Sequence, residues 1–213
     1  MIKRELYMNR IRPFIGGELI KVMTGIRRSG KSVMLELIKE ELAEAGVAPS
    51  QMISINFEDM RYSHLQTATA LHDEIIKRAE GIEGKAYLFF DEIQEVEGWE
   101  KCVNSLRVAL DCDIYITGSN AKLLSGELAT YIGGRYVEFV IYPFSFAEFL
   151  ELYHTIAPSD SIQQCFQKYL LAGGMPYLAN LRYEEEPSRQ YLTDLFNSCL
   201  LYTSDAADDL IGV

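Results

Sequence analysis

Residues 25–32 have the order and spacing of a phosphate-binding loop. They read G-x-x-x-x-G-K-S, a pattern whose backbone N–H groups surround phosphate oxygens at the start of a helix. Gly25 and Gly30 permit a close backbone approach that a Cβ atom would block. Lys31 would reach the β- and γ-phosphates, and the Ser32 hydroxyl would bind Mg²⁺. The predicted nucleotide-binding residues are Gly25, Ile26, Arg27, Arg28, Ser29, Gly30, Lys31, Ser32 and Val33.

An acidic pair, Asp91 and Glu92, directly follows the apolar run of residues 86–90. Hydrophobic residues followed by Asp-Glu form the Walker B arrangement. We expect Asp91 to hold Mg²⁺, through water or by pairing with Ser32. We expect Glu92 to be the general base that orients and polarises the attacking water. Small-molecule P-loop kinases usually lack this base, so Glu92 favours hydrolysis over phosphate transfer.

A polar segment at the end of the next predicted strand contains candidates for contact with the γ-phosphate. Thr117, Ser119 or Asn120 would lie between that phosphate and Glu92 and help to position water. Asn120 is included among the catalytic candidates. The alternative is local structure, because Gly, Ser and Asn commonly form turns and cap helices.

Arg135 is a further catalytic candidate, because an arginine there would stabilise charge on the transferring phosphoryl group, in cis or from a neighbouring subunit. The alternative is a structural ion pair with Glu138 or Glu148. Asn56 is a weaker candidate. It would either hydrogen-bond Glu92 and hold it inactive or, as is more usual for Asn, cap a turn.

The elements that must position these residues alternate between strand and helix patterns. This alternation is typical of an α/β fold with a parallel sheet covered on both faces by helices. From Ser145 onward the pattern is helical only, so we expect an α/β unit at 1–144 and a helical unit at 145–198. The predicted strands are 20–23, 52–57, 86–90, 113–117 and 136–141. The predicted helices before residue 145 are 32–45, 68–79, 99–110 and 121–128.

The composition favours a cytoplasmic protein without membrane contact. No apolar run approaches the length needed to cross a bilayer, and the N-terminus lacks the apolar stretch of a signal peptide. The four cysteines show no C-x-x-C pairing and no His at metal spacing, which indicates reduced core cysteines and argues against zinc. The net charge of −11 argues against a broad nucleic-acid-binding face.

The segment 199–213 differs in kind from the rest of the chain. A reverse translation of its start, TGT CTC TTA TAC ACA TCT GAC GCT GCC GAC GAy, resembles the transposon-end adapter used in sequencing libraries. We therefore expect these residues to be read-through into adapter and exclude them from the fold. Removing Asp205, Asp208 and Asp209 would change the net charge from −11 to −8.

Together these motifs resemble the AAA+ superfamily of P-loop ATPases, and more narrowly a prokaryotic family of predicted AAA-domain ATP-binding proteins. The resemblance spans roughly Leu6 to Tyr183 and implies a central strand order of 5-1-4-3-2, followed by a helical lid. It also implies ATP as the nucleotide, and a lid turn at 173–176 that faces it through Pro176. The matching segments are 25–32, 90–94, 117–121, 134–136, 142–149 and 173–176.

Members of that family continue into a C-terminal region with a winged-helix part and a nuclease-like domain. The resemblance therefore implies that this chain is C-terminally truncated and its lid incomplete. A nucleic-acid role would arise only through that missing region. The protein partner is unknown, and a homo-oligomer stays open.

The resulting hypothesis is a Mg²⁺-dependent ATPase that acts as a motor or switch for an unknown partner. A second hypothesis is a signalling module that binds nucleotide with little turnover and works through lid movement. A third is a phosphotransferase with a small acceptor, against which Glu92 and the helical lid both argue.

Overall fold

The computed structural model describes residues 2–118 and 132–198, and the chain divides into two compact units. The larger unit consists of Lys3–Ile26 and Gly30–Ile141. The smaller unit consists of Met1–Ile2, Arg27–Ser29 and Tyr142–Val213. The helix predicted at 121–128 and the segment 199–213 lie outside the described residues.

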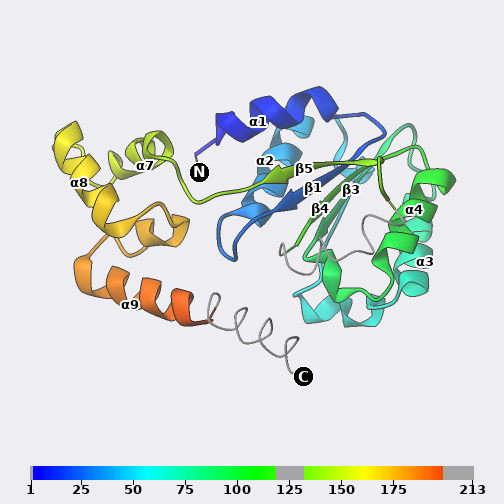
Figure 1. Cartoon of the computed structure of the whole chain (residues 1–213). Coiled ribbons are helices and arrows are strands. Elements are labelled where there is room, and N and C mark those ends of the chain that lie inside the picture. The colour runs from blue at the N-terminus through cyan, green and yellow to red at the C-terminus, as the bar shows by residue number, and fades with distance from the viewer. Residues whose placement is uncertain (1, 119–131, 199–213) are drawn as a thin grey trace, which may run out of the picture. The chain divides into compact units, whose positions relative to one another are not determined.

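A five-stranded parallel sheet forms the centre of the larger unit (Figure 1). Its order is β2-β3-β4-β1-β5, so the predicted order is confirmed. Because every strand pair is parallel, the carboxyl ends of β1, β3 and β4 lie at the same edge of the sheet. The strands are β1 Ile20–Thr24, β2 Met52–Asn56, β3 Ala86–Asp91, β4 Cys112–Thr117 and β5 Tyr136–Val140.

Helices cover both faces of this sheet (Figure 1). Two helices, α1 (Glu5–Ile11) and α2 (Lys31–Glu44), pack apolar side chains against one face. On the other face lie α3 (Ala68–Ala79) and α4 (Trp99–Ala109). The sequence did not predict α1, because seven residues are too short for a decisive helical period.

Short 3-10 helices connect several of these elements. Thr67 caps α3 by accepting a hydrogen bond from the Ala70 N–H at 3.3 Å, so its hydroxyl satisfies a donor that the helix leaves unpaired. The 3-10 helices are η1 Arg12–Phe14, η2 Pro49–Gln51, η3 Met60–Leu65, η4 Ile93–Glu95 and, in the smaller unit, η5 Pro176–Ala179.

A buried ion pair joins the second residues of β1 and β4. The Lys21 ammonium donates to the Asp113 carboxylate, and both side chains are fully buried. Asp113 also accepts from the Gly16 N–H and the Tyr115 hydroxyl, each at 2.7 Å. Burial lowers the pKa of Lys21, an effect that the Asp113 carboxylate opposes. Through the Gly16 N–H, the network therefore connects the segment before β1 to β4 of the sheet.

The smaller unit is helical, with α7 at Phe146–Tyr153, α8 at Ile162–Ala172 and α9 at Glu185–Phe196. Ser145 and Ser161 begin α7 and α8 as capping boxes, with Glu148 and Gln164 three residues later. The core contains an aromatic cluster around Phe149. No helix in the described part of the chain is long and apolar enough to span a membrane.

Gly174 allows two segments of the smaller unit to touch. The Phe144 N–H donates to the Gly174 carbonyl at 2.7 Å, and the Tyr169 hydroxyl donates to the Phe144 carbonyl at 2.9 Å. A Cβ atom at position 174 would lie 2.0 Å from the Phe144 carbonyl oxygen. Only glycine fits at this contact without a shift of the backbone.

Candidate functional site

The predicted phosphate loop connects β1 to α2. Its last residue, Gly30, caps α2 with a φ of 101°, a left-handed conformation that favours glycine. The 14-residue helix α2 begins directly after Gly30. Its positive N-terminal end therefore lies at the loop. Ile26 and Val33 are exposed, at 52% and 37%, which leaves both side chains available to a ligand.

Lys31 extends from the first turn of α2 along the loop. Its side chain is almost fully buried, and its ammonium donates to the carbonyls of Gly25 at 3.3 Å and Ile26 at 3.4 Å. The same ammonium lies 3.8 Å from Glu92 Oε1. The fold thus joins the predicted loop to the predicted acidic pair.

Asp91 ends β3 beside the loop and is 6% exposed. It accepts hydrogen bonds from the Thr117 hydroxyl and, at 3.1 Å, from Asn56 Nδ2. Burial raises the pKa of the Asp91 carboxyl, while hydrogen bonds from Thr117 and Ser32 counteract that rise. Ser32 and Asp91, the two oxygen ligands expected for Mg²⁺, are therefore near enough for the Ser32 hydroxyl to affect the Asp91 pKa.

Thr117 is the one described residue among the three candidates for γ-phosphate contact. Besides donating to Asp91, its Oγ1 accepts from the Glu92 N–H at 3.0 Å. Ser119 and Asn120 lie outside the described residues. The end of β4 is therefore bonded to both members of the acidic pair, through a strand-end threonine.

The hydrogen bond considered from Asn56 to Glu92 is wrong. Asn56 Nδ2 binds Asp91, and Asn56 Oδ1 accepts from the Glu58 N–H at 2.9 Å as a turn cap. The physical reason is register, because Asn56 is aligned with Asp91 in the parallel pair β2–β3. Of the two side-chain hydrogen bonds of Asn56, the one accepted by Oδ1 is the turn cap of the alternative interpretation.

Glu92 has a left-handed backbone with φ of 55° and ψ of 49°. Non-glycine residues in this region are uncommon and cluster at functional sites. The Glu92 carboxylate accepts from Gln94 Nε2 at 2.6 Å, a partner that the sequence analysis missed. A second missed contact joins Thr24, the residue before the loop, to Glu138 at 2.6 Å.

Arg135 lies away from these residues. Its carbonyl accepts from the Ile20 N–H at 2.9 Å, so it stands where β1 begins, whereas the loop follows the other end of β1. Five residues of strand span about 16 Å. A role in cis is therefore wrong, and Arg135 Nη1 donates to Asn104 at 2.5 Å. The role in trans stays a prediction.

The other predicted binding residues belong to the smaller unit. Arg27, Arg28 and Ser29 group with it, and the Arg28 guanidinium lies 6.0 Å from the ring centroid of Tyr191 in α9. Arg28 also has a positive φ of 65°. Pro176 begins η5, and its contact with nucleotide stays a prediction.

Comparison with known proteins places these motifs in a wider context. A family model described as "AAA domain" matches residues 18–150. An uncharacterized protein of Haemophilus influenzae is 41% identical over 202 residues, which cover 94% of this chain and 50% of that protein. The uncharacterized protein MJ1544 of Methanocaldococcus jannaschii is 34% identical over 189 residues, covering 83% of this chain and 41% of its own. The chain spans about half the length of these relatives.

Solved structures share the fold at low sequence identity. The Aeropyrum pernix Orc1 protein in complex with DNA has a TM-score of 0.53 at 16% identity, covering 73% of this chain and 49% of that one. The replication initiator DnaA bound to AMPPCP and single-stranded DNA has a TM-score of 0.57 at 14% identity, covering 85% and 60%. Both carry the α/β architecture described above.

Proposed function

The chain belongs to the AAA domain family, and from that premise we propose that it binds ATP with Mg²⁺ and hydrolyses it, as a motor or switch for a partner. Residues 1–144 would form the ATPase core and residues 145–198 a lid. The proposal concerns the region that the chain shares with these relatives, which is 50% and 41% of their length.

One observation carries the proposal, namely the convergence of the loop and the acidic pair. The ammonium of Lys31 lies 3.8 Å from Glu92, and the Ser32 hydroxyl counteracts the rise that burial causes in the pKa of Asp91. In this arrangement Lys31 would bind phosphate oxygens, and Glu92 would take a proton from the attacking water. In support of the nucleotide, one structural neighbour holds AMPPCP, an ATP analogue, on the same fold.

The chemistry of the donor set fits Mg²⁺. The ion commonly binds one or two carboxylates plus substrate phosphates, and Asp91 and Ser32 supply the protein oxygens here. Within residues 2–118 and 132–198, no group of three or more His, Cys, Asp or Glu forms a complete cage. Bound together with the phosphates, the ion would neutralise their charge.

A second candidate is a nucleotide switch with little turnover. Two contacts favour it, because Gln94 and Lys31 both engage the Glu92 carboxylate and would keep it from water. A single-turnover assay, followed by a steady-state assay with excess ATP, separates the two. Tight retention of ADP with negligible release of phosphate supports the switch, and multiple turnovers support the ATPase.

The decisive variant is Glu92→Gln, which keeps the shape and removes the base. We expect steady-state hydrolysis to fall by about a hundredfold or more while ATP affinity stays within a few fold. Lys31→Ala should abolish nucleotide binding, measured by titration calorimetry. Hydrolysis that is unchanged in Glu92→Gln would overturn the catalytic assignment. Unchanged ATP affinity in Lys31→Ala would overturn the site itself.

A further inference from the structure

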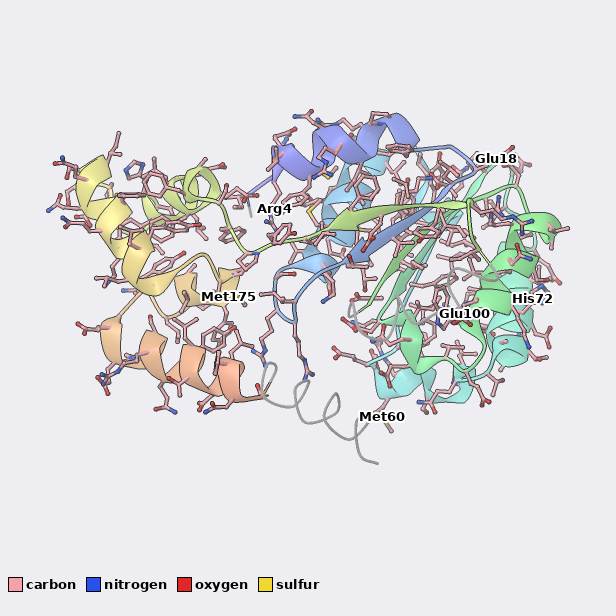
Figure 2. All side chains as sticks on the ribbon, viewed as in Figure 1. Arg4, Glu18, Met60, His72, Glu100 and Met175 are labelled. Atoms are coloured by element: carbon pink, nitrogen blue, oxygen red, sulfur yellow. The ribbon has the colours of Figure 1, made fainter. Side chains whose placement is uncertain are left out.

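A buried arginine of the N-terminal segment, Arg4, lies against the phosphate loop. It is 3% exposed, and Figure 2 shows it at the start of α1. A Cβ atom built on Gly30 would lie 3.4 Å from Arg4 Nη1, so the guanidinium faces the residue that ends the loop. No sequence motif pointed to this residue.

The backbone around Arg4 holds the side chain in that position. Arg4 has φ of 47° and ψ of 48°, and its carbonyl accepts from the N–H groups of Tyr7 at 2.9 Å and Met8 at 3.2 Å. Both residues are buried against the sheet in α1. The Arg4 guanidinium also lies 4.6 Å from the Tyr7 ring centroid. The packing of α1 therefore restricts the positions that the Arg4 guanidinium can adopt.

A few other residues of the chain share the left-handed backbone conformation of Arg4. Among described non-glycine residues, five have positive φ, and three of them are Arg4, Arg28 and Glu92. Such conformations persist where surrounding structure imposes them and often mark functional sites. Arg4 thus shares a left-handed backbone conformation with two predicted site residues.

Electrostatics at Gly30 favours an anion. Two buried cations flank the N-terminal end of α2, which is itself positive: Lys31 is the first residue of the helix, and the Arg4 guanidinium faces its cap, Gly30. A guanidinium beside the helix end adds to the positive potential that attracts phosphate oxygens. Its planar set of donors also suits phosphate oxygens better than a single ammonium does.

We propose that Arg4 is a further phosphate-binding residue, which contacts the phosphates of the bound nucleotide together with Lys31. The inference rests on the proposed function, because it concerns the same site. It specifies the ligand class as a nucleoside di- or triphosphate and places the N-terminal segment in its binding site. Nucleotide binding would consequently order the segment that leads into α1.

Three variants test this inference in the full chain. Arg4→Ala removes the charge, Arg4→Lys keeps a cation with fewer donors, and Arg10→Ala is the matched control, because Arg10 is an exposed arginine of the same helix. We expect Arg4→Ala to weaken ATP binding by about tenfold or more. Arg4→Lys should recover part of the loss, and Arg10→Ala should stay within about twofold of wild type.

Two readouts distinguish phosphate contact from a purely structural role. The first is competition by inorganic tripolyphosphate, whose inhibition constant should rise in Arg4→Ala by a factor similar to that for ATP. The second is hydrogen exchange in the wild-type protein, where ATP should slow exchange of the amides of residues 5–8. The second readout keeps the test valid if Arg4→Ala does not fold.

The outcomes separate this inference from the proposed function. One outcome overturns the role of Arg4 but not the proposed function. In it, a folded Arg4→Ala binds ATP and tripolyphosphate within twofold of wild type, while Lys31→Ala binds no nucleotide. The role of Arg4 is also overturned if the wild type binds ATP without any change in hydrogen exchange at the amides of residues 5–8. If the wild-type protein binds no nucleotide, both proposals are overturned.

Discussion

Thr117 donates a hydrogen bond from β4 to the Asp91 carboxylate at the end of β3. The same Thr117 oxygen accepts the Glu92 N–H at 3.0 Å. A single hydroxyl therefore orients the carboxylate expected to hold Mg²⁺ and fixes the backbone of the residue expected to be the base.

We expect Thr117→Val to lower ATP hydrolysis by roughly tenfold, because the loss of one hydrogen bond to a charged group is of that order. ATP affinity should change by less, since Lys31 and the loop stay in place. Steady-state phosphate release and calorimetry measure the two effects. Thr117→Ser keeps the hydroxyl and should restore most of the activity. Equal activities for Thr117→Val and wild type would remove Thr117 from the mechanism.

Arg135 gives a test for assembly. Because it stands at the opposite edge of its own sheet from the loop, we expect any catalytic contribution to reach a neighbouring subunit. Arg135→Ala and Lys31→Ala should each be inactive alone, and mixing them should restore part of the hydrolysis. In the mixture, the Arg135→Ala chain supplies an intact phosphate loop and the Lys31→Ala chain supplies an intact Arg135, so the two can meet at an interface between chains. Full activity of Arg135→Ala by itself would rule out the role in trans.

The buried ion pair should matter for stability. Asp113→Ala leaves the Lys21 ammonium buried without its carboxylate, so the free energy of unfolding should fall by about 3–5 kcal/mol. Urea denaturation followed by circular dichroism measures this loss. The double variant Lys21→Met with Asp113→Leu replaces both charges by apolar groups and should recover much of it. A single variant as stable as wild type would contradict this interpretation of the network.

Cys102, which is buried, and Cys112, which is partly buried, should resist alkylation in the folded protein. Burial raises the pKa of Cys102 to about 12 and that of Cys112 to about 11, so both thiols stay protonated near neutral pH. Between about pH 8.5, where unfolded thiols ionise, and pH 11, only the unfolded chain loses these protons, so stability falls as pH rises. Mass spectrometry after iodoacetamide treatment at pH 7.5, with and without urea, measures the protection. Rapid labelling without urea would be the contrary result.

Gly174 should tolerate no side chain. In Gly174→Ala the Cβ atom would meet the Phe144 carbonyl, so we expect the smaller unit to lose its thermal stability or to become sensitive to protease. Gly46→Ala is the control, because Gly46 also has positive φ, at 93°, but nothing lies within 4 Å of its Cβ position. The control should lose only about 1 kcal/mol from backbone strain. Equal losses in the two variants would show that the close contact does not matter.

Much of the fold could be predicted from the sequence, because the informative patterns are local. The glycines of a loop between a strand and a helix indicate the backbone conformation of that loop. An apolar run that ends in Asp-Glu indicates a buried strand with a polar end. The limits of α3 agree with the helix predicted at 68–79. The short helix α1 was missed because its stability comes from packing on the sheet, which no local pattern of seven residues records.

By itself, the sequence determined the phosphate loop, the acidic pair and the alternation of strands and helices, since each depends on residues that are close along the chain. Tertiary structure alone decided that Asn56 meets Asp91, that Arg135 stands at the other edge of the sheet, and that Arg4 faces Gly30. The physical reason is that strand direction and register set which distant residues become neighbours. Those two properties emerge only when the whole sheet and its helices pack together.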